Sequence, residues 1–270
     1  MTEQIDYAAI GQRQQQSWAA GDFSMVARMT VLPAETLVAA AGLRAGNTVL
    51  DIATGSGNVA LAAARRFCTV TGIDFVPSLL ERARERAAVE QLDATFVEGD
   101  AAALPVDDAS FDVVLSQFGV MFAPDQQRAA DEVVRICRPG GTIALASWTP
   151  DSQPAELFRI NAKYIPPPAG LKPPVRWGTE EALHELFGDR VRWRRMERQI
   201  SPQQFYSAVH YVEFFRKYLG PSVRAFASLD SGQQEALARD VMDCVERFNR
   251  SGDSTVLLEN TYLESVGTRV

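Results

Sequence analysis

The chain has 270 residues, of which 46% are hydrophobic and 23% charged, an ordinary composition for a globular protein with a full hydrophobic core. Lys and Arg number 27 against 34 Asp and Glu, and the resulting formal charge of −7 disfavours nucleic acid or an anionic membrane as a partner. The stretch 1–16 is polar, unlike a signal peptide, and no apolar run approaches the roughly 20 residues that span a bilayer. Cys68, Cys137 and Cys244 have no metal-ligand spacing, so we expect reduced thiols, a cytoplasmic protein and no metal site.

The leading segment, 1–46, reads as a series of helices. A polar helix is predicted over 7–20, followed by a break at 21–24. A second helical segment starts at Met25, and a third helix over 33–41 ends at Gly42. We expect this segment to precede the core of the fold.

A buried strand, a glycine loop and an alanine-rich helix follow one another from 48 to 64. Val49, Leu50 and Ile52 are apolar, whereas Asp51 puts a carboxylate at the end of the strand, which costs free energy unless it meets a partner. The loop amides and the start of the helix favour electron-rich groups, while Asp51 favours a cation. A ligand with both a carboxylate and an ammonium group would suit this corner.

The same loop fits the G-x-G-x-x-[GA] fingerprint of dinucleotide-binding proteins. Its residues are Gly55 to Ala60, with Asp74 about twenty residues further on. This signal is weak by itself, and Asp51 would repel a pyrophosphate. An NAD(P)-dependent oxidoreductase therefore stays open as an alternative.

The second parallel strand is predicted over 69–74 and ends at Asp74. A carboxylate at this point of a nucleotide-binding sheet can accept hydrogen bonds from both hydroxyls of a ribose. Asp74 could instead cap the helix that begins near Pro77 and Ser78. The adjoining Phe75 could cover one face of an adenine ring.

Three further strands are predicted over 94–98, 111–116 and 142–148. Asp100 and Ala101 follow the first of these, so a second carboxylate stands at a strand end. The stretch after the next strand brings polar and apolar side chains together at the carboxyl edge of the sheet: Ser116, Gln117, Phe118, Met121 and Phe122.

The second half of the chain changes character after 149, where prolines mark irregular connections. A sixth strand is predicted over 191–200, helices over 202–218 and 233–249, and a last, antiparallel strand over 255–266. The block 201–252 is too long for a simple loop, so we interpret it as a helical cap inserted into a core formed by 47–200 and 253–270. A purely structural extension is the alternative. The arginines of 190–198 read as the solvated face of a strand, with a patch that recognises an acidic substrate as the alternative.

Four stretches in this order resemble one protein family: LDIATGSGNVA (50–60), GIDFVPSLLERAR (72–84), FVEGDAAALPVDDASFDVVLSQFGVMF (96–122) and RPGGTIALASW (138–148). They closely resemble the class I S-adenosylmethionine-dependent methyltransferases, and among these the small-molecule group that includes the enzymes of ubiquinone and menaquinone biosynthesis. Ala53 stands where many members carry a glycine, and its small side chain should still permit the turn.

The resemblance implies an α/β, Rossmann-like fold: a seven-stranded, mostly parallel sheet with an antiparallel last strand, helices on both faces and a helical cap. It implies S-adenosylmethionine (SAM) as the cofactor and S-adenosylhomocysteine (SAH) as its product. Asp100 would accept the exocyclic amine of adenine, and the Ala101 amide would serve a ring nitrogen; an acidic turn residue without a ligand is the alternative for Asp100. The leading segment would pack over the cofactor as a lid, with Phe23 and Met29 either in the pocket or in plain core. The full set of expected cofactor contacts is Asp51, Ala53, Thr54, Gly55, Ser56, Gly57, Asp74, Phe75, Asp100, Ala101, Ser116, Gln117 and Met121.

Transfer of a sulfonium methyl group needs alignment and exclusion of water more than it needs protein side chains. A hydroxyl acceptor must also lose its proton, for which His210 on the predicted cap is the candidate catalytic base. A lone histidine on an aromatic-rich helix can equally be structural, and His184 belongs to an outer helix. The candidate substrate contacts are Phe118, Tyr206 and Tyr211, with Trp177 as a further pocket residue.

The Asn/Asp-Pro-Pro-Tyr motif of family members that methylate nucleic acids or proteins is absent after the fourth strand. We therefore predict a single-domain enzyme, a monomer or homodimer, that methylates a small apolar or aromatic metabolite on oxygen or carbon, with nitrogen possible. A catalytically silent SAM-binding partner protein stays open beside the oxidoreductase.

Overall fold

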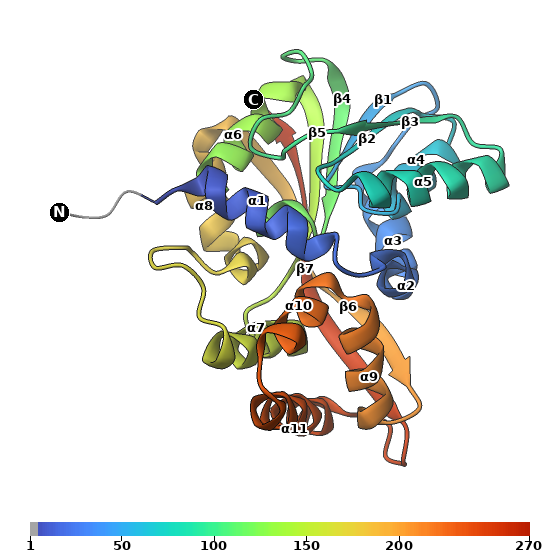
Figure 1. Cartoon of the computed structure of the whole chain (residues 1–270). Coiled ribbons are helices and arrows are strands. Elements are labelled where there is room, and N and C mark those ends of the chain that lie inside the picture. The colour runs from blue at the N-terminus through green and yellow to red at the C-terminus, as the bar shows by residue number, and fades with distance from the viewer. Residues whose placement is uncertain (1–4) are drawn as a thin grey trace.

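The computed structural model describes residues 5–270, and a seven-stranded sheet organises them (Figure 1). The strands are β1 (Thr48–Ile52), β2 (Thr69–Asp74), β3 (Ala94–Glu98), β4 (Phe111–Gln117), β5 (Cys137–Trp148), β6 (Val191–Phe205) and β7 (Val256–Arg269). Their order is β3-β2-β1-β4-β5-β7-β6; the first five are parallel, and β7 is antiparallel to both β5 and β6. The predicted Rossmann-like fold class is confirmed.

Helices cover both faces of the sheet (Figure 1). One face carries α3 (Val31–Ala41), α4 (Asn58–Ala64) and α5 (Pro77–Glu90), and the other carries α6 (Gln126–Ile136) and α8 (Glu180–Phe187). Every residue of α4 is buried, because its small alanines allow the helix to lie close to β1 and β2.

The strand order reverses between β1 and β4. From β1 the chain proceeds outward to β2 and β3, and then returns to place β4 and β5 on the other side of β1. At such a switch point the loops after the two central strands turn away from each other and leave a crevice, which is where ligands bind in open α/β sheets. A ligand site is therefore expected at the carboxyl ends of β1, β2 and β4.

The amino-terminal helices lie across that edge. They are α1 (Tyr7–Trp18), α2 (Phe23–Ala27) and the 3₁₀ turn η1 (Arg28–Thr30), which leads into α3. Asp6 caps α1 and Asp22 caps α2, each accepting a backbone N–H of the first turn. Gln15 ties α1 to the sheet, since its Nε2 donates to the Phe75 carbonyl at 2.5 Å. Residues 1–4 of the predicted lid segment lie outside the described residues.

The expectation that no apolar run approaches the length of a membrane span was wrong for 23–41. This 19-residue helical stretch, which contains only Arg28 and Glu35 as charged residues, is long and apolar enough to span a membrane by length and composition alone. In the fold it comprises α2, η1 and α3, and Ala34, Leu37 and Val38 of α3 are fully buried in the main hydrophobic core. Packing of α3 against α4 and β5 accounts for these apolar residues.

Residues 202–205 were expected to start a helix, and this was wrong. They continue β6, with Pro202 opposite Glu259 and Phe205 opposite Val256. A proline is tolerated there because β6 is an edge strand, in which alternate backbone N–H groups have no neighbouring strand to donate to. The predicted division between a core ending at 200 and a cap over 201–252 stays a prediction, but its boundary falls inside this strand.

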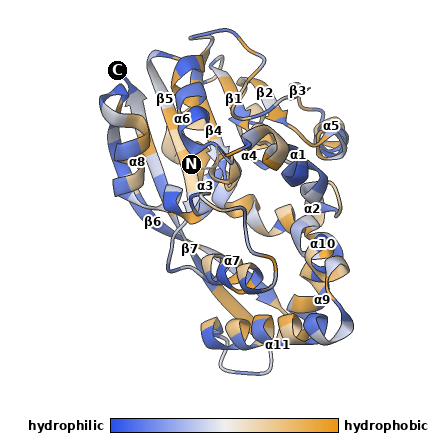
Figure 2. Cartoon of the chain, turned by 60° about the vertical axis from the view of Figure 1, so that its left-hand side comes forward, coloured by the Kyte–Doolittle hydropathy of each residue, from blue (hydrophilic) through white to orange (hydrophobic). Residues whose placement is uncertain are grey.

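The cap helices, which we define as α9 (Ala208–Tyr218), α10 (Gly220–Ser228) and α11 (Ser231–Phe248), connect β6 to β7. Helix α10 had no counterpart among the predicted elements. Together with α7 (Gln153–Tyr164) these helices pack on the far ends of β6 and β7, away from the parallel part of the sheet (Figures 1 and 2). Figure 2 shows α11 with alternating hydrophilic and hydrophobic colour, as expected of a helix with one buried face. A separate hydrophobic cluster lies between these elements and includes Ile160, Phe205, Phe214, Leu237 and Leu258.

The amino-terminal helices and the cap helices meet at two glycines. A Cβ added at Gly21 would overlap the Tyr218 carbonyl oxygen, and one at Gly220 would overlap the Ser17 carbonyl oxygen. The two backbones therefore approach more closely than any side chain would allow. This contact joins the amino-terminal helices to the cap helices.

Candidate active site

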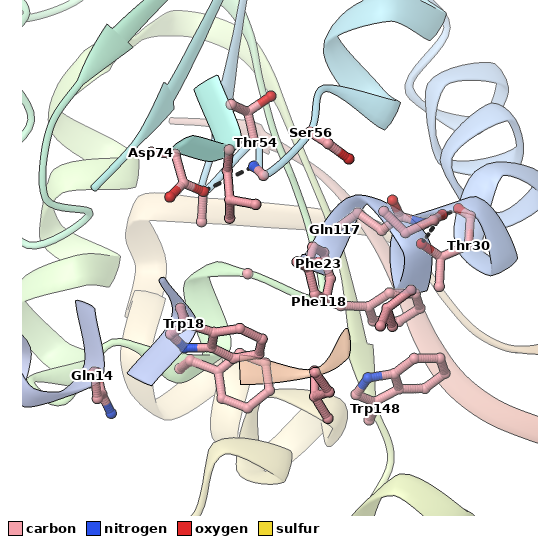
Figure 3. Close-up of a pocket in the computed structure, with 18 of the residues that line it drawn as sticks. Gln14, Trp18, Phe23, Thr30, Thr54, Ser56, Asp74, Gln117, Phe118 and Trp148 are labelled. Carbon is pink, nitrogen blue, oxygen red and sulfur yellow. Dashed lines mark hydrogen bonds between the residues drawn. The ribbon is translucent and has the colours of Figure 1, made fainter. Parts of the chain in front are cut away.

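A large cavity occupies the crevice at the carboxyl ends of the strands (Figure 3). Its volume is about 200 Å³, and it is open to solvent at its mouth. Its walls come from the glycine loop, the ends of β2 to β5, the amino-terminal helices, α7, β6 and α9. Segments more than two hundred residues apart, from Gly11 to Leu219, thus share one cavity. Their chemistry divides it into two halves.

The first half is built on the glycine loop after β1. Ala53, Gly55 and Gly57 have φ angles of 54°, 55° and 89°, so the chain turns three times through the left-handed region within five residues. The Ala53 side chain packs on Gly119, where an added Cβ would lie 2.6 Å from the Ala53 Cβ, so a side chain at position 119 would collide with this turn. Of the predicted loop contacts, Ala53, Thr54, Gly55 and Ser56 line the cavity and Gly57 does not.

Asp74 lies beside this loop and faces the cavity (Figure 3). Its carboxylate accepts the Gly55 N–H at 2.8 Å and the Val76 N–H at 2.9 Å. Burial raises its pKa to about 6, against the lowering effect of these hydrogen bonds. A carboxylate has about four acceptor positions, so Asp74 can accept further hydrogen bonds from a ligand.

Asp51 has a different place from the one expected. It is 1% exposed, does not line the cavity, and accepts the Thr54 hydroxyl at 2.6 Å and the Ala60 N–H at 3.0 Å. Burial raises its pKa to about 7. Asp51 therefore holds the loop against the start of α4. Its position does not bring it into contact with a ligand in the cavity.

The far end of this half is formed by Phe75, Leu79, Asp100 and Ala101. Asp100 is exposed, and one of its oxygens accepts the Ala102 N–H at 2.8 Å. The other carboxyl oxygen faces Gly11 of α1, which has no side chain to cover it. Two carboxylates, Asp74 and Asp100, therefore face the same half of the cavity.

The polar residues at the end of β4, Ser116 and Gln117, connect segments of the chain through hydrogen bonds. Ser116 is 1% exposed and links Ile52 to Val120 through its hydroxyl, which donates at 2.7 Å and accepts at 3.1 Å. Met121 is fully buried, and neither it nor Ser116 lines the cavity, contrary to expectation. Gln117 does line it, but its Nε2 donates to the Thr30 carbonyl at 2.8 Å and so ties β4 to the amino-terminal helices (Figure 3).

The second half of the cavity has an aromatic wall (Figure 3). Phe118 and Trp148 stack with ring centroids 3.7 Å apart, and Trp18 meets both Phe23 and Phe122 edge to face. Phe118 has a φ of 51°, a rare backbone conformation for a bulky residue, and this turn directs its ring to the wall. Further lining residues of this half include Leu157, Phe158, Phe215, Leu219, Gln153, Gln203 and Tyr211.

Two of the predicted residues on the cap lie away from the cavity. Tyr206 is 82% exposed, and its ring lies against His210, whose Nδ1 accepts the Tyr206 N–H at 3.3 Å. Neither residue lines the cavity, and neither do His184 or Trp177, which belong to α8 and the turn before it. The expected catalytic role of His210 is therefore not supported by its position.

Several residues of the aromatic half were not identified from the sequence: Trp148, Gln153, Phe158 and Gln203. Trp148 ends β5 and could have been found by the rule that strand ends meet at one edge of the sheet. No local signal marks Gln153, Phe158 or Gln203, because their approach to the cavity depends on how α7 and β6 pack. Among the described residues that line the cavity, the ionisable side chains are Asp74, Asp100 and Tyr211, and none is cationic.

Comparison with known proteins identifies the family. Residues 50–145 match the family model described as a methyltransferase domain. An uncharacterised protein of Mycobacterium tuberculosis is 40% identical over 227 residues, covering 83% of this chain and 82% of that protein. A demethylmenaquinone methyltransferase of Deinococcus radiodurans is 37% identical over 126 residues, covering 45% of this chain and 52% of that enzyme.

A solved structure shares the fold. The crystal structure of the YcgJ protein from Bacillus subtilis superposes with a TM-score of 0.62 at 17% identity, covering 87% of this chain and 97% of that one. The sheet topology, the glycine loop with its strand-end carboxylates, and these similarities all indicate the same family. The chain belongs to the class I S-adenosylmethionine-dependent methyltransferases and resembles the enzymes of quinone biosynthesis among them.

Proposed function

We propose that this methyltransferase binds SAM in the glycine-loop half of the cavity and methylates a small, uncharged, largely apolar or aromatic metabolite held in the aromatic half. The observation that carries the proposal is the division of one cavity into an acidic, hydrogen-bonding half and an aromatic half without charge. Methylation on oxygen or carbon fits such an acceptor best.

The residues of the first half fit SAM. Asp74 is 5% exposed, pairs with no cation within residues 5–270, and keeps acceptor capacity that ribose hydroxyls would fill. Asp100 and the Ala101 amide would hold adenine beside Phe75, and the loop from Ala53 to Ser56 would hold the methionine part. Asp51 contributes by bracing that loop.

SAM supplies a methyl group that is already electrophilic. The carbon–sulfur bond breaks with its electron pair remaining on sulfur, while a lone pair of the acceptor forms the new bond to carbon. The chain's contribution is alignment of the acceptor and exclusion of water, for which the stacked Phe118 and Trp148 form a dry wall. No histidine lines the cavity within residues 5–270, so we propose that no histidine acts as the base for a hydroxyl acceptor.

The proposed chemical class of the acceptor follows from the aromatic side chains of the second half of the cavity. A ring stacked on aromatic side chains gains stacking as well as burial, whereas a carboxylate or phosphate acceptor would find no cation among the described lining residues. The Deinococcus relative is named for demethylmenaquinone, a compound of this apolar, ring-containing kind. We further propose a cytoplasmic monomer or homodimer that acts on a free small molecule, not on nucleic acid or at a membrane; sedimentation of the purified chain tests the oligomeric state.

Calorimetric titration with SAM and SAH tests the proposal first. We expect micromolar binding that weakens about tenfold or more in Asp74→Ala. Asp112→Ala is the matched control, because Asp112 is a strand carboxylate that bonds Thr48 and Arg138 away from the cavity. Absence of SAM binding, or tight binding of a nicotinamide dinucleotide instead, would contradict the proposal. Binding without turnover on any hydroquinone, phenol or enol would indicate a silent SAM-binding protein.

A further inference from the structure

Tyr211 is a buried tyrosine in the uncharged half of the cavity. It belongs to α9, lines the cavity, and is 1% exposed. Its ring is held between Phe205, at a centroid distance of 4.8 Å, and Phe215, at 4.4 Å. These contacts leave the ring little freedom, so the position of its hydroxyl is set by packing.

The Tyr211 hydroxyl has one hydrogen-bond partner in the described chain. Gln153 of α7, also a lining residue and 2% exposed, donates to it from Nε2 at 3.1 Å. The Tyr211 hydroxyl donates to no residue within 5–270, and the Gln153 Oε1 is likewise unpaired. If the amide were turned over, Oε1 would accept from Tyr211 and Nε2 would be left without an acceptor. In either orientation the pair has an unused donor beside the cavity.

An unused buried donor costs free energy unless a ligand supplies the acceptor. Burial raises the pKa of Tyr211, so its hydroxyl keeps its proton and acts as a donor rather than as a base. No lysine, arginine or histidine lines the described cavity to compete for an acceptor oxygen. Gln203, 5% exposed, adds a third uncharged polar side chain to this half.

We infer that Tyr211, oriented by Gln153, donates a hydrogen bond to an uncharged oxygen of the methyl acceptor, a hydroxyl or carbonyl group on an apolar ring system. This inference rests on the proposed function, because it assigns the acceptor to the aromatic half of the same cavity. It makes Tyr211 a specificity-determining residue: the site selects neutral, oxygen-bearing rings over rings without oxygen and over carboxylates.

The test measures ligand binding, not turnover, with three probes of one shape. Naphthol carries a neutral oxygen, naphthalene carries none, and naphthoate carries a charge. Binding to the SAH-saturated protein is followed by quenching of tryptophan fluorescence, since Trp18 and Trp148 both line the cavity. We expect naphthol to bind about fivefold or more tightly than naphthalene, and naphthoate to bind more weakly than naphthol.

The variant Tyr211→Phe keeps the ring and removes the hydroxyl. It should bind naphthol as weakly as naphthalene, with unchanged affinity for naphthalene and SAH. Tyr262→Phe is the matched control, because Tyr262 is also 1% exposed and touches Phe118 and Trp148 but does not line the cavity. It should retain the preference for naphthol.

Naphthol binding that is equal in the wild type and Tyr211→Phe would overturn the inference and leave Tyr211 as a structural residue. Failure of the wild type to prefer naphthol over both other probes would overturn it as well. SAH binding is measured separately by calorimetry, so its absence would contradict the proposed function, and the three probes would then be compared without SAH. Thermal unfolding of both variants checks that the fold is intact.

Discussion

Phe118 and Trp148 lie face to face, with ring centroids 3.7 Å apart and planes 4° from parallel, although they lie at the ends of different strands of the sheet. Phe118 continues the chain after β4 and Trp148 ends β5, and the parallel pairing of these strands brings the two rings to the same edge. Tyr262 of β7 supports both rings edge to face from the next strand. The sheet itself thus builds the aromatic wall.

Removing one ring of this stack should weaken acceptor binding without affecting the cofactor. An aromatic pair contributes about 0.5–1.5 kcal/mol beyond burial, so Phe118→Leu should raise the acceptor KM roughly two- to tenfold. The affinity for SAH should stay within about twofold of wild type, since Phe118 lies outside the glycine-loop half. Steady-state kinetics and calorimetry measure the two effects. Phe187→Leu, a buried ring that contacts Trp177 away from the cavity, should lower stability and leave KM unchanged.

SAM binding should weaken in acid because of Asp74. Burial raises the pKa of this carboxyl to about 6 in the free protein, and donors from the ligand favour its ionised form. The affinity should therefore be constant above about pH 7 and fall up to tenfold per unit below about pH 6. Calorimetry across this range checks the profile. Asp74→Asn should bind weakly with a flat profile; an unchanged slope in that variant would assign the titration to another group.

Stability should respond to pH through Asp51. Its pKa is raised by burial from 3.8 to about 7, so the folded chain holds a proton between these values that the unfolded chain has released. The contribution of Asp51 to the free energy of unfolding therefore falls as the pH rises through this window, by up to roughly 1.4 kcal/mol per pH unit.

Asp51→Asn should remove this dependence. The amide oxygen can still accept from Thr54 and Ala60, and no charge has to be buried. Denaturant unfolding should show that the free energy of unfolding of the variant, relative to that of the wild type, increases as the pH rises from about 4 to 8. A difference that does not vary with pH would show that Asp51 does not titrate in this window.

The contact between the amino-terminal helices and the cap helices should tolerate no side chain. Gly220→Ala puts a methyl group onto the Ser17 carbonyl oxygen, so the two backbones must separate. We expect a loss of about 1–3 kcal/mol in stability and weaker acceptor binding. Gly232→Ala is the control, because Gly232 lies in the first turn of α11 with space for a Cβ, and it should be neutral or slightly stabilising. Unfolding curves that coincide for both variants would contradict this.

Local chemistry made the glycine-loop half predictable. The strand, loop and helix over 48–64 follow from periodicity and from turn residues a few positions apart, and parallel strands carry their end residues to one edge of the sheet. Asp74, Asp100 and the loop from Ala53 to Ser56 could therefore be placed at a common cavity from the order of the elements alone. Asp51 and Ser116 were assigned to the same edge for the same reason, but whether a strand-end side chain faces a ligand or its own backbone depends on rotamer and packing.

The sequence by itself determined the family, the sheet and the acidic half of the cavity. Only the tertiary structure decided the other half: it brought Tyr211 and Gln153 into contact, turned His210 towards Tyr206, and extended β6 through Pro202. These residues come from helices and strands far apart in the chain, and the rotation of each element is set by the hydrophobic contacts it makes with the others. No pattern within one segment carries that information, because the packing energy belongs to pairs of segments.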